Sequence, residues 1–140
     1  MAADEELVFM RICSRPERLR LLRDVVRDAA DIAGLDEAGA DAVVLAVNEA
    51  CMNIIQHGYR MDPAGRIDIR VSREPGALVV QLRDYAGRVD VSTVCSRDLD
   101  DVRPGGLGVH LIGCLMDESG FLDAPSDGGN LFQMKKFVTV

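Results

Sequence analysis

The sequence has no tryptophan and few aromatic residues, which make up 4% of its 140 positions, so indole fluorescence cannot report a bound ligand. It also lacks an uninterrupted apolar run of the roughly 18 to 20 residues that a membrane-spanning helix requires. The N-terminus, Met-Ala-Ala-Asp-Glu-Glu, is acidic, whereas a secretory signal begins with basic residues followed by an apolar stretch. We therefore expect no signal peptide, no membrane association and a cytoplasmic location.

Positive charge is also in short supply, because 16 Lys and Arg residues stand against 23 Asp and Glu residues, which gives a net charge of −7. A nucleic-acid-binding surface must neutralise phosphates, so we expect no nucleic-acid partner. The chain lacks the closely spaced cysteine pairs of zinc sites. Its four cysteines are expected to be reduced thiols, mostly packed in the interior: Cys13, Cys51, Cys95 and Cys114.

The hydrophobic patterns that are present predict one domain over residues 1–140, with the order β, α, α, β, β, α, β, β. Strands are expected at 6–13, 66–72, 77–83, 119–123 and 130–139, and the pair around Glu74-Pro75-Gly76 forms a hairpin. Ser14 with Glu17 fits a capping box for the first helix, which Gly34 can end. Short turns between strands indicate an α+β fold, a two-layer sandwich with a mixed, mostly antiparallel sheet and three helices on one face.

The second predicted helix, from Asp36 to about His57 with Gly58 as its stop, places polar side chains along one edge. Its core face carries Val43, Val44, Val47, Ala50, Cys51, Ile54 and Ile55. Glu49, Asn53 and His57 lie four residues apart on another side, and the small Ala42 and Ala46 beside them leave space. An amide oxygen can bind Mg²⁺ and a nearby carboxylate can act as a base. A solvated polar face is the commoner explanation of such a pattern, and for His57 a helix-end position is the better one.

Two further features point to a nucleotide. Asp84 ends a predicted strand, where a carboxylate can accept a hydrogen bond from an adenine amino group, although aspartate also suits a plain turn. The segment Gly105-Gly106-Leu107-Gly108-Val109 leads directly into an apolar helical run. Amides at such a junction can bind phosphate, although a flexible loop before a helix has the same composition. It is not a P-loop, because no Gly-Lys-Ser/Thr follows.

Together these segments resemble the GHKL ATPase superfamily, and within it the anti-sigma-factor serine/threonine-protein kinases of bacterial partner switching. The segment from Val47 to Tyr59 resembles the family's N-box, Asp84 the aspartate of its first glycine box, and 105–118 its second glycine box. The closing Gly129-Asn130-Leu131 also fits. The resemblance covers nearly the whole chain in the right order.

The resemblance implies a Bergerat-type ATP-binding fold and the cofactors ATP and Mg²⁺. Glu49 would be the catalytic base, Asn53 the Mg²⁺ ligand and Asp84 the adenine contact, with a lid at 88–104. The nucleotide would be bound by Asn53, Asp84, Gly87, Gly105, Gly106, Leu107, Gly108 and Val109. The implied partners are a STAS-type anti-sigma-factor antagonist, which the kinase phosphorylates, and a sigma factor; a homodimer is a further expectation.

The first glycine box departs from the family pattern, which has glycine two and four residues after the aspartate. This chain has Ala86 and Arg88 at those positions, with Gly87 between them. The alternative function is therefore a nucleotide-dependent partner-binding module without kinase activity. A histidine-kinase catalytic domain is disfavoured, since both histidines, His57 and His110, lie inside the presumed ATP-site motifs.

Overall fold

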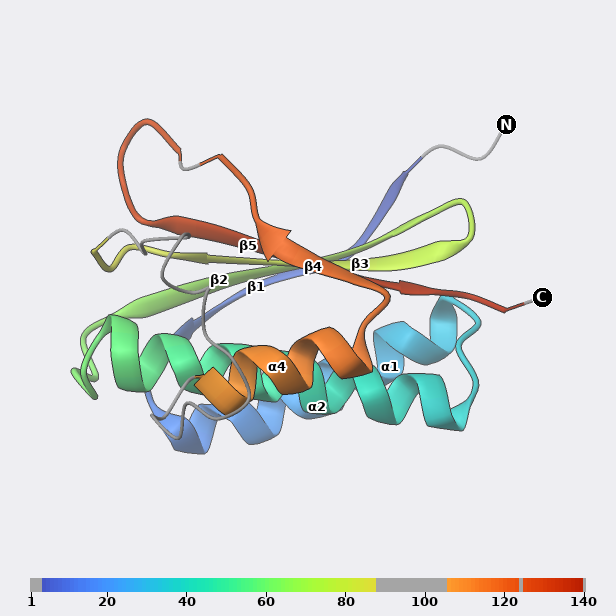
Figure 1. Ribbon diagram of the computed structural model, residues 1–140, viewed down its shortest axis with the longest axis horizontal. Coiled ribbons are helices and arrows are strands. Elements are labelled where there is room, and N and C mark those ends of the chain that lie inside the picture. Colours follow the sequence, from blue (N-terminus) through green and yellow to red (C-terminus); the bar gives the residue numbers. More distant parts are fainter. Residues whose placement is uncertain (1–3, 88–105, 124, 140) are drawn as a thin grey trace.

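The computed structural model describes residues 4–87, 106–123 and 125–139, with the backbone alone for residues 106–109. One sheet is covered on one face by helices, which confirms the predicted two-layer α+β architecture (Figure 1). The strands are β1 (Glu5–Cys13), β2 (Arg66–Glu74), β3 (Ala77–Asp84), β4 (Glu118–Phe121) and β5 (Asn130–Phe137). The helices are α1 (Leu19–Ile32), α2 (Glu37–Asn53) and α4 (Gly106–Leu115), with short turns η1 (Pro16–Arg18) and η2 (Ile54–Gly58).

The sheet has the strand order β1-β2-β3-β5-β4, and every neighbouring pair of described strands is antiparallel. The expected parallel component is absent from these strands for a topological reason. β3 and β4 run in the same direction, as a crossover through α4 requires, but β5 inserts between them and pairs with both. The crossover therefore joins strands that are not neighbours.

The core lies between the sheet and the helices. β2 and β3 each send alternate side chains toward the helices, and these are fully buried: Ile67, Ile69, Val71, Leu78, Val80 and Leu82. Alternate apolar positions along both sequences, at 67–71 and 78–82, predict this buried face. The hairpin turn also forms as expected, and Gly76 adopts a positive φ of 80° there.

The start of the first helix differs from the predicted capping box. The chain enters a 3-10 turn at Pro16, its N-cap is Arg15, and no side chain caps it. The main-chain N–H of Ser14 instead donates to the carbonyl of Gly65 at 2.8 Å, and its buried hydroxyl has no hydrogen-bond partner among the described residues. At the other end, Gly34 follows α1 with a φ of 95°, which confirms it as the stop signal.

α2 is the central helix, packed between α1 and α4 as well as against the sheet (Figure 1). Asp36 caps it, because its Oδ1 accepts a hydrogen bond from the Gly39 N–H at 2.7 Å. The predicted core face is buried, except that Ile54 is only half-buried. Ala46, expected to leave open space beside Glu49, is fully buried because neighbouring helices enclose α2 on more than one side. That part of the prediction is wrong.

The segment Glu37–Gly58 is long and apolar enough to span a membrane by length and composition, with a mean hydropathy of 1.4 over its most apolar window. Half of that window is buried inside the fold. Core helices meet the same criterion, so this is weak evidence for a membrane span. The lack of an uninterrupted apolar run in the sequence therefore does not by itself exclude a membrane-spanning helix.

The cysteines are less enclosed than expected. Of the three in the described ranges, only Cys51 is buried, and burial raises the pKa of its thiol to about 12. Cys13 and Cys114 are exposed, so the prediction of mostly packed thiols is wrong for this part of the chain. Cys95 lies outside the described residues. All three described cysteines are free thiols.

Candidate functional site

The last turn of α2 carries the two polar residues that the sequence singled out. Glu49 and Asn53 are both half-buried and stand one helical turn apart on the same face. Neither side chain hydrogen-bonds to any other residue that the structure describes. Beside them, Arg23 of α1 donates from Nη1 to Oδ1 of Asn48 at 2.9 Å and fastens the two helices together. A carboxylate and an amide oxygen are thus presented on a rigid support.

The helix changes its winding directly after Asn53. Residues 54–58 form a π-helical turn, in which the Tyr59 N–H donates to the carbonyl of Ile54 at 2.8 Å. This wider turn displaces His57, which is exposed, from the four-residue stripe expected for a regular α-helix. The predicted stripe is therefore correct for Glu49 and Asn53 and wrong for His57. The end of the helix at Gly58 is confirmed.

Gly58 brings the end of η2 against the segment that follows β3. A Cβ added to Gly58 would lie 3.3 Å from the Cβ of Ala86. The methyl group of Ala86, which replaces the usual glycine, therefore occupies space that Gly58 leaves open. The helix carrying Glu49 and Asn53 and the segment carrying Asp84 are thus adjacent through this contact.

Asp84 is the last residue of β3 and one of the few buried charged residues, with 5% of its surface exposed. Its Oδ1 accepts hydrogen bonds from the Ala86 N–H and from Nδ2 of Asn130, both at 3.0 Å. Asn130 also donates to the carbonyl of Gly87 at 2.9 Å. Burial raises the pKa of Asp84, and the two donors partly offset that effect. Its Oδ2 accepts no hydrogen bond from any described residue.

The turn before β5 holds the main chain of Asp84 from the other side. Gly129 has a φ of 78°, and an added Cβ would lie 2.1 Å from the carbonyl oxygen of Asp84. Only glycine fits this position, for both conformational and steric reasons. The motif Gly129-Asn130 thus places one residue against the backbone of Asp84 and the next against its carboxylate.

The glycine-rich segment opens α4, as predicted. The helix begins at Gly106, so Leu107, Gly108 and Val109 belong to its first turn, where amide N–H groups have no partner within the helix. Such an end attracts anions. Gly105 and the expected lid at 88–104 lie outside the described residues. Figure 1 shows the end of β3, η2 and the first turn of α4 toward the same end of the molecule.

Tyr59 and Tyr85 contribute to this region although the sequence did not single out a role for either. The Tyr59 hydroxyl donates to the Arg66 carbonyl at 2.6 Å and accepts from the Tyr85 N–H at 2.7 Å. Gly65 leaves room for the Tyr59 ring, which an added Cβ would overlap at 2.5 Å. Burial raises the pKa of Tyr59, so its hydroxyl stays protonated and can donate. These contacts could not be predicted from the sequence, because nothing in the residues around Tyr59 indicates which distant groups its hydroxyl will meet.

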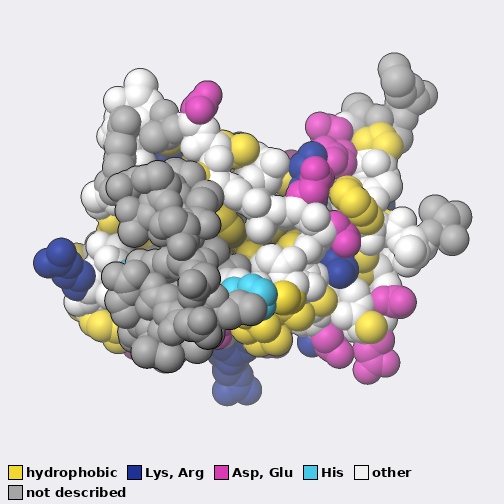
Figure 2. Space-filling model, in the orientation of Figure 1, with side chains coloured by type: hydrophobic (Ala, Val, Ile, Leu, Met, Phe, Trp, Pro, Cys, Tyr) yellow, Lys and Arg dark blue, Asp and Glu magenta, His cyan; other side chains and the backbone are white. Residues whose placement is uncertain are grey.

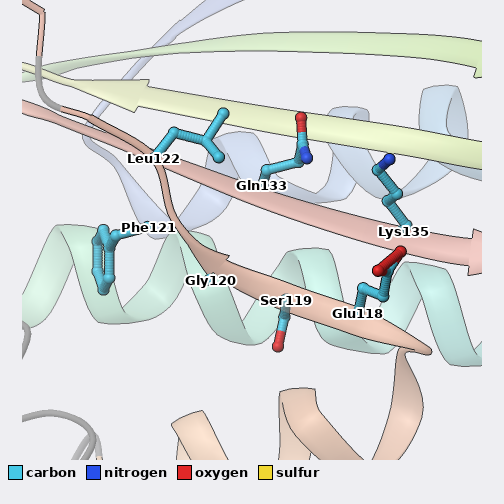
Figure 3. A pocket seen from close by; sticks show the side chains of 7 residues that line it. All are labelled: Glu118, Ser119, Gly120, Phe121, Leu122, Gln133 and Lys135. Atoms are coloured by element: carbon cyan, nitrogen blue, oxygen red, sulfur yellow. The ribbon is translucent and has the colours of Figure 1, made fainter.

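A separate hollow of about 200 Å³ lies on β4 and β5 (Figure 3). Its lining runs from Glu118 to Leu122 and includes Gln133 and Lys135. None of the residues predicted to bind nucleotide lines it, and its volume is below the roughly 300–1,000 Å³ usual for small-molecule sites. Lys135 there is paired with Glu74 at 2.9 Å, which raises the pKa of the lysine. This hollow is not the candidate site.

The expected absence of a nucleic-acid partner stays a prediction, which rests on the net charge of −7. On the face seen in Figure 2, the described Lys and Arg side chains lie in small separate groups and form no continuous basic area. Within the described ranges no group of three or more His, Cys, Asp or Glu side chains could hold a metal ion. A Mg²⁺ ion bound through one amide oxygen and substrate phosphates requires no such group.

Most of the chain matches the model of a known family. Residues 12–136 match the model of the histidine kinase-like ATPase domain. The chain belongs to this family. Membership supports the use of ATP, and it confirms the resemblance inferred from the motifs.

Curated relatives of this ATPase-family chain carry the name serine-protein kinase RsbW. The protein from Bacillus subtilis (strain 168) is 28% identical over 126 residues, which cover 84% of this chain and 79% of the relative. The protein from Bacillus licheniformis is 26% identical over 141 residues, which cover 95% and 86%.

Solved structures confirm the fold. One contains the RsbU and RsbW domains of a Mycobacterium tuberculosis protein, with a TM-score of 0.68 and 16% identity over 98% of this chain and 32% of that chain. Another is the SiaB–SiaC complex from Pseudomonas aeruginosa, also with a TM-score of 0.68, at 14% identity over 94% of this chain and 89% of that chain.

Proposed function

We propose that this chain is a cytoplasmic protein-serine/threonine kinase, with residues 1–140 forming one ATP-binding domain. It transfers the γ-phosphoryl group of Mg-ATP to a hydroxyl group on a small regulatory protein. The observation that carries the proposal is the buried Asp84 carboxylate, which has one oxygen held by protein donors and the other without a partner among the described residues. Relatives named serine-protein kinase over most of the chain support the reaction class.

The side chains around Asp84 have separate tasks in this proposal. The Oδ2 atom of Asp84 accepts a hydrogen bond from the adenine amino group, and Gly87 lies beside it without a side chain. The first turn of α4, together with Gly105, offers main-chain N–H groups to the phosphates through residues 105–109. Asn53 would hold Mg²⁺, whose charge offsets the negative charge of the phosphates when it is bound.

Glu49 acts as the catalytic base. It stands one turn from Asn53, is half-buried, and has no hydrogen-bond partner among the described residues. It accepts the proton of the substrate hydroxyl as the hydroxyl oxygen bonds to the γ-phosphorus and ADP leaves. Phosphoryl transfer depends mainly on positioning and charge stabilisation, which a rigid helix face can provide.

The proposed acceptor is a serine or threonine of a STAS-type anti-sigma-factor antagonist, and the unphosphorylated complex competes with binding of a sigma factor. The RsbW name of the relatives and the SiaB–SiaC complex support a protein partner. A homodimer is part of the same proposal. The second candidate function is a nucleotide-dependent binding module without phosphoryl transfer, which Ala86 favours because it places a methyl group where the family usually has glycine.

The test uses purified protein added to native cell extract with Mg-ATP or Mg-ADP, followed by mass spectrometry of bound proteins and their phosphosites. A STAS-type protein retained with ADP and phosphorylated on serine or threonine with ATP is the expected result. Glu49→Gln should retain nucleotide binding and lose the phosphosite. Equal retention of a partner under both nucleotides, with no phosphosite, would support the binding module instead.

A further inference from the structure

The outer face of the sheet, opposite the helices, contains an ion pair between a half-exposed arginine and a buried aspartate. Asp68 of β2 has only 6% of its surface exposed. Arg11 on β1 donates to both carboxylate oxygens, from Nε at 2.5 Å and from Nη2 at 3.0 Å. This pairing lowers the pKa of Asp68, so the carboxylate is ionised and fixed in place.

Tyr85, the residue after Asp84, is anchored to this ion pair. Its hydroxyl donates to Oδ2 of Asp68 at 2.5 Å. The guanidinium of Arg66 lies 4.1 Å from its ring centroid and that of Arg83 lies 4.6 Å from it. The ring of Tyr85 is therefore fixed at its hydroxyl and by contacts with two cations.

The same contacts extend to the segments that touch Asp84. Arg83 donates from Nη2 to Asp127 at 2.6 Å and to the carbonyl of Gly128 at 3.2 Å, which ties it to the turn containing Gly129. The main-chain N–H of Tyr85 donates to Tyr59 at the end of η2. The contacts of Tyr85 thus join the outer face of the sheet to two segments beside Asp84, the end of η2 and the turn before β5.

We propose that Tyr85 is a positioning residue for nucleotide recognition. Held by the Arg11–Asp68 pair, it fixes the main chain immediately after Asp84, so that the Asp84 oxygen without a protein partner stays aimed at the adenine amino group. This inference rests on the proposed function and adds a determinant of base selectivity that lies on the opposite face of the sheet from the helices. The ordering of Asp84 before ATP arrives lowers the entropy cost of binding.

The experiment compares Mg-ATP with Mg-purine riboside 5′-triphosphate, which lacks only the amino group, in equilibrium binding to the parent and to Tyr85→Phe. The variant keeps the ring and its stacking and loses one hydrogen bond to a carboxylate. We expect ATP affinity to fall about three- to tenfold, the size of one net hydrogen bond. Affinity for the purine riboside triphosphate should stay within about twofold, since that ligand has no amino group for Asp84.

Two further variants make the test specific. Arg11→Gln, at a half-exposed position, should lower ATP selectivity in the same direction. Arg70→Gln is the matched control. Arg70 lies on the same face of β2 as Asp68, but it pairs with Glu6 at 2.7 Å, away from Tyr85. It should leave both affinities unchanged.

The outcomes separate the inference from the function on which it rests. If the parent binds both triphosphates equally, the adenine role of Asp84 fails and the Tyr85 inference with it. If the parent prefers ATP but Tyr85→Phe weakens both ligands equally, or neither, only the Tyr85 inference is overturned. The same loss of selectivity in Arg70→Gln would also overturn it, since the effect would then come from general loosening of the sheet.

Discussion

Replacement of Asp84 by asparagine separates nucleotide recognition from folding with a change of one atom. The amide retains an oxygen for the Ala86 N–H and the Asn130 side chain, which both donate to Oδ1 in the parent. It places an NH₂ donor at the other position, where the adenine amino group requires an acceptor. A hydrogen bond to a charged group contributes about 1.5–3 kcal/mol. Affinity for Mg-ATP should therefore fall roughly 10- to 150-fold, at about 1.36 kcal/mol per factor of ten.

The stability of the nucleotide-free protein should change in the opposite direction. Because burial raises the folded-state pKa of Asp84 above the ordinary 3.8, the stability that its protonated form contributes is complete below that pH. It is lost as the pH rises through the folded-state pKa, so at pH 7 the buried charge is destabilising. Asp84→Asn has no such charge, and its melting temperature at pH 7 should equal or exceed that of the parent.

Titration calorimetry with Mg-ATP and thermal unfolding without nucleotide measure the two quantities. Asp41→Asn is the matched control, because Asp41 is exposed on α2 in an ion pair with Arg27 and should leave both unchanged. Unaltered ATP affinity in Asp84→Asn would refute the adenine assignment. A melting temperature well below that of the parent would refute the assignment of Asp84 as a buried, destabilising charge.

Three other predictions follow from the site and its supports. Gly129→Ala should lower the free energy of unfolding in urea by at least about 1–3 kcal/mol, because a positive φ strains alanine and its Cβ would overlap the Asp84 carbonyl. Gly120→Ala is the control, since open space surrounds the Cβ added there. A loss no larger than that of the control would contradict the geometry. Asn53→Ala should weaken ATP binding in Mg²⁺ while leaving binding in EDTA unchanged, and equal losses in both would remove the metal assignment. Arg11 holds the pKa of Asp68 below 3.8, so the stability from this pair is lost as the pH falls through that lowered pKa. In Arg11→Gln the melting temperature should therefore fall less steeply as the pH is lowered. Equal falls in the variant and the parent would count against the pairing.

The sequence alone determined the class of fold and the elements on which the candidate site residues lie, because these depend on local pattern. Alternation over 66–72 and 77–83 indicated the buried faces of β2 and β3, and the four-residue spacing placed Glu49 and Asn53 on one helix face. Gly106 at the start of α4 and Gly58 at the end of η2 were also predictable, because glycine at a helix boundary has a local conformational cause. Combined in one order, these signals indicated the ATPase family.

The tertiary structure decided the features that depend on contacts between segments far apart in the sequence. Asp68 reads as a solvent-facing strand residue, but it is buried because Arg11 and Tyr85 converge on it from β1 and the end of β3. Ala46 reads as an open neighbour of Glu49, but the helices packed against α2 enclose it. Asn130 reaches Asp84 only because β5 inserts beside β3 and pairs these two residues in register. No local period encodes which strand will insert there, so the hydrogen bonds that hold the site were visible only once the sheet was assembled.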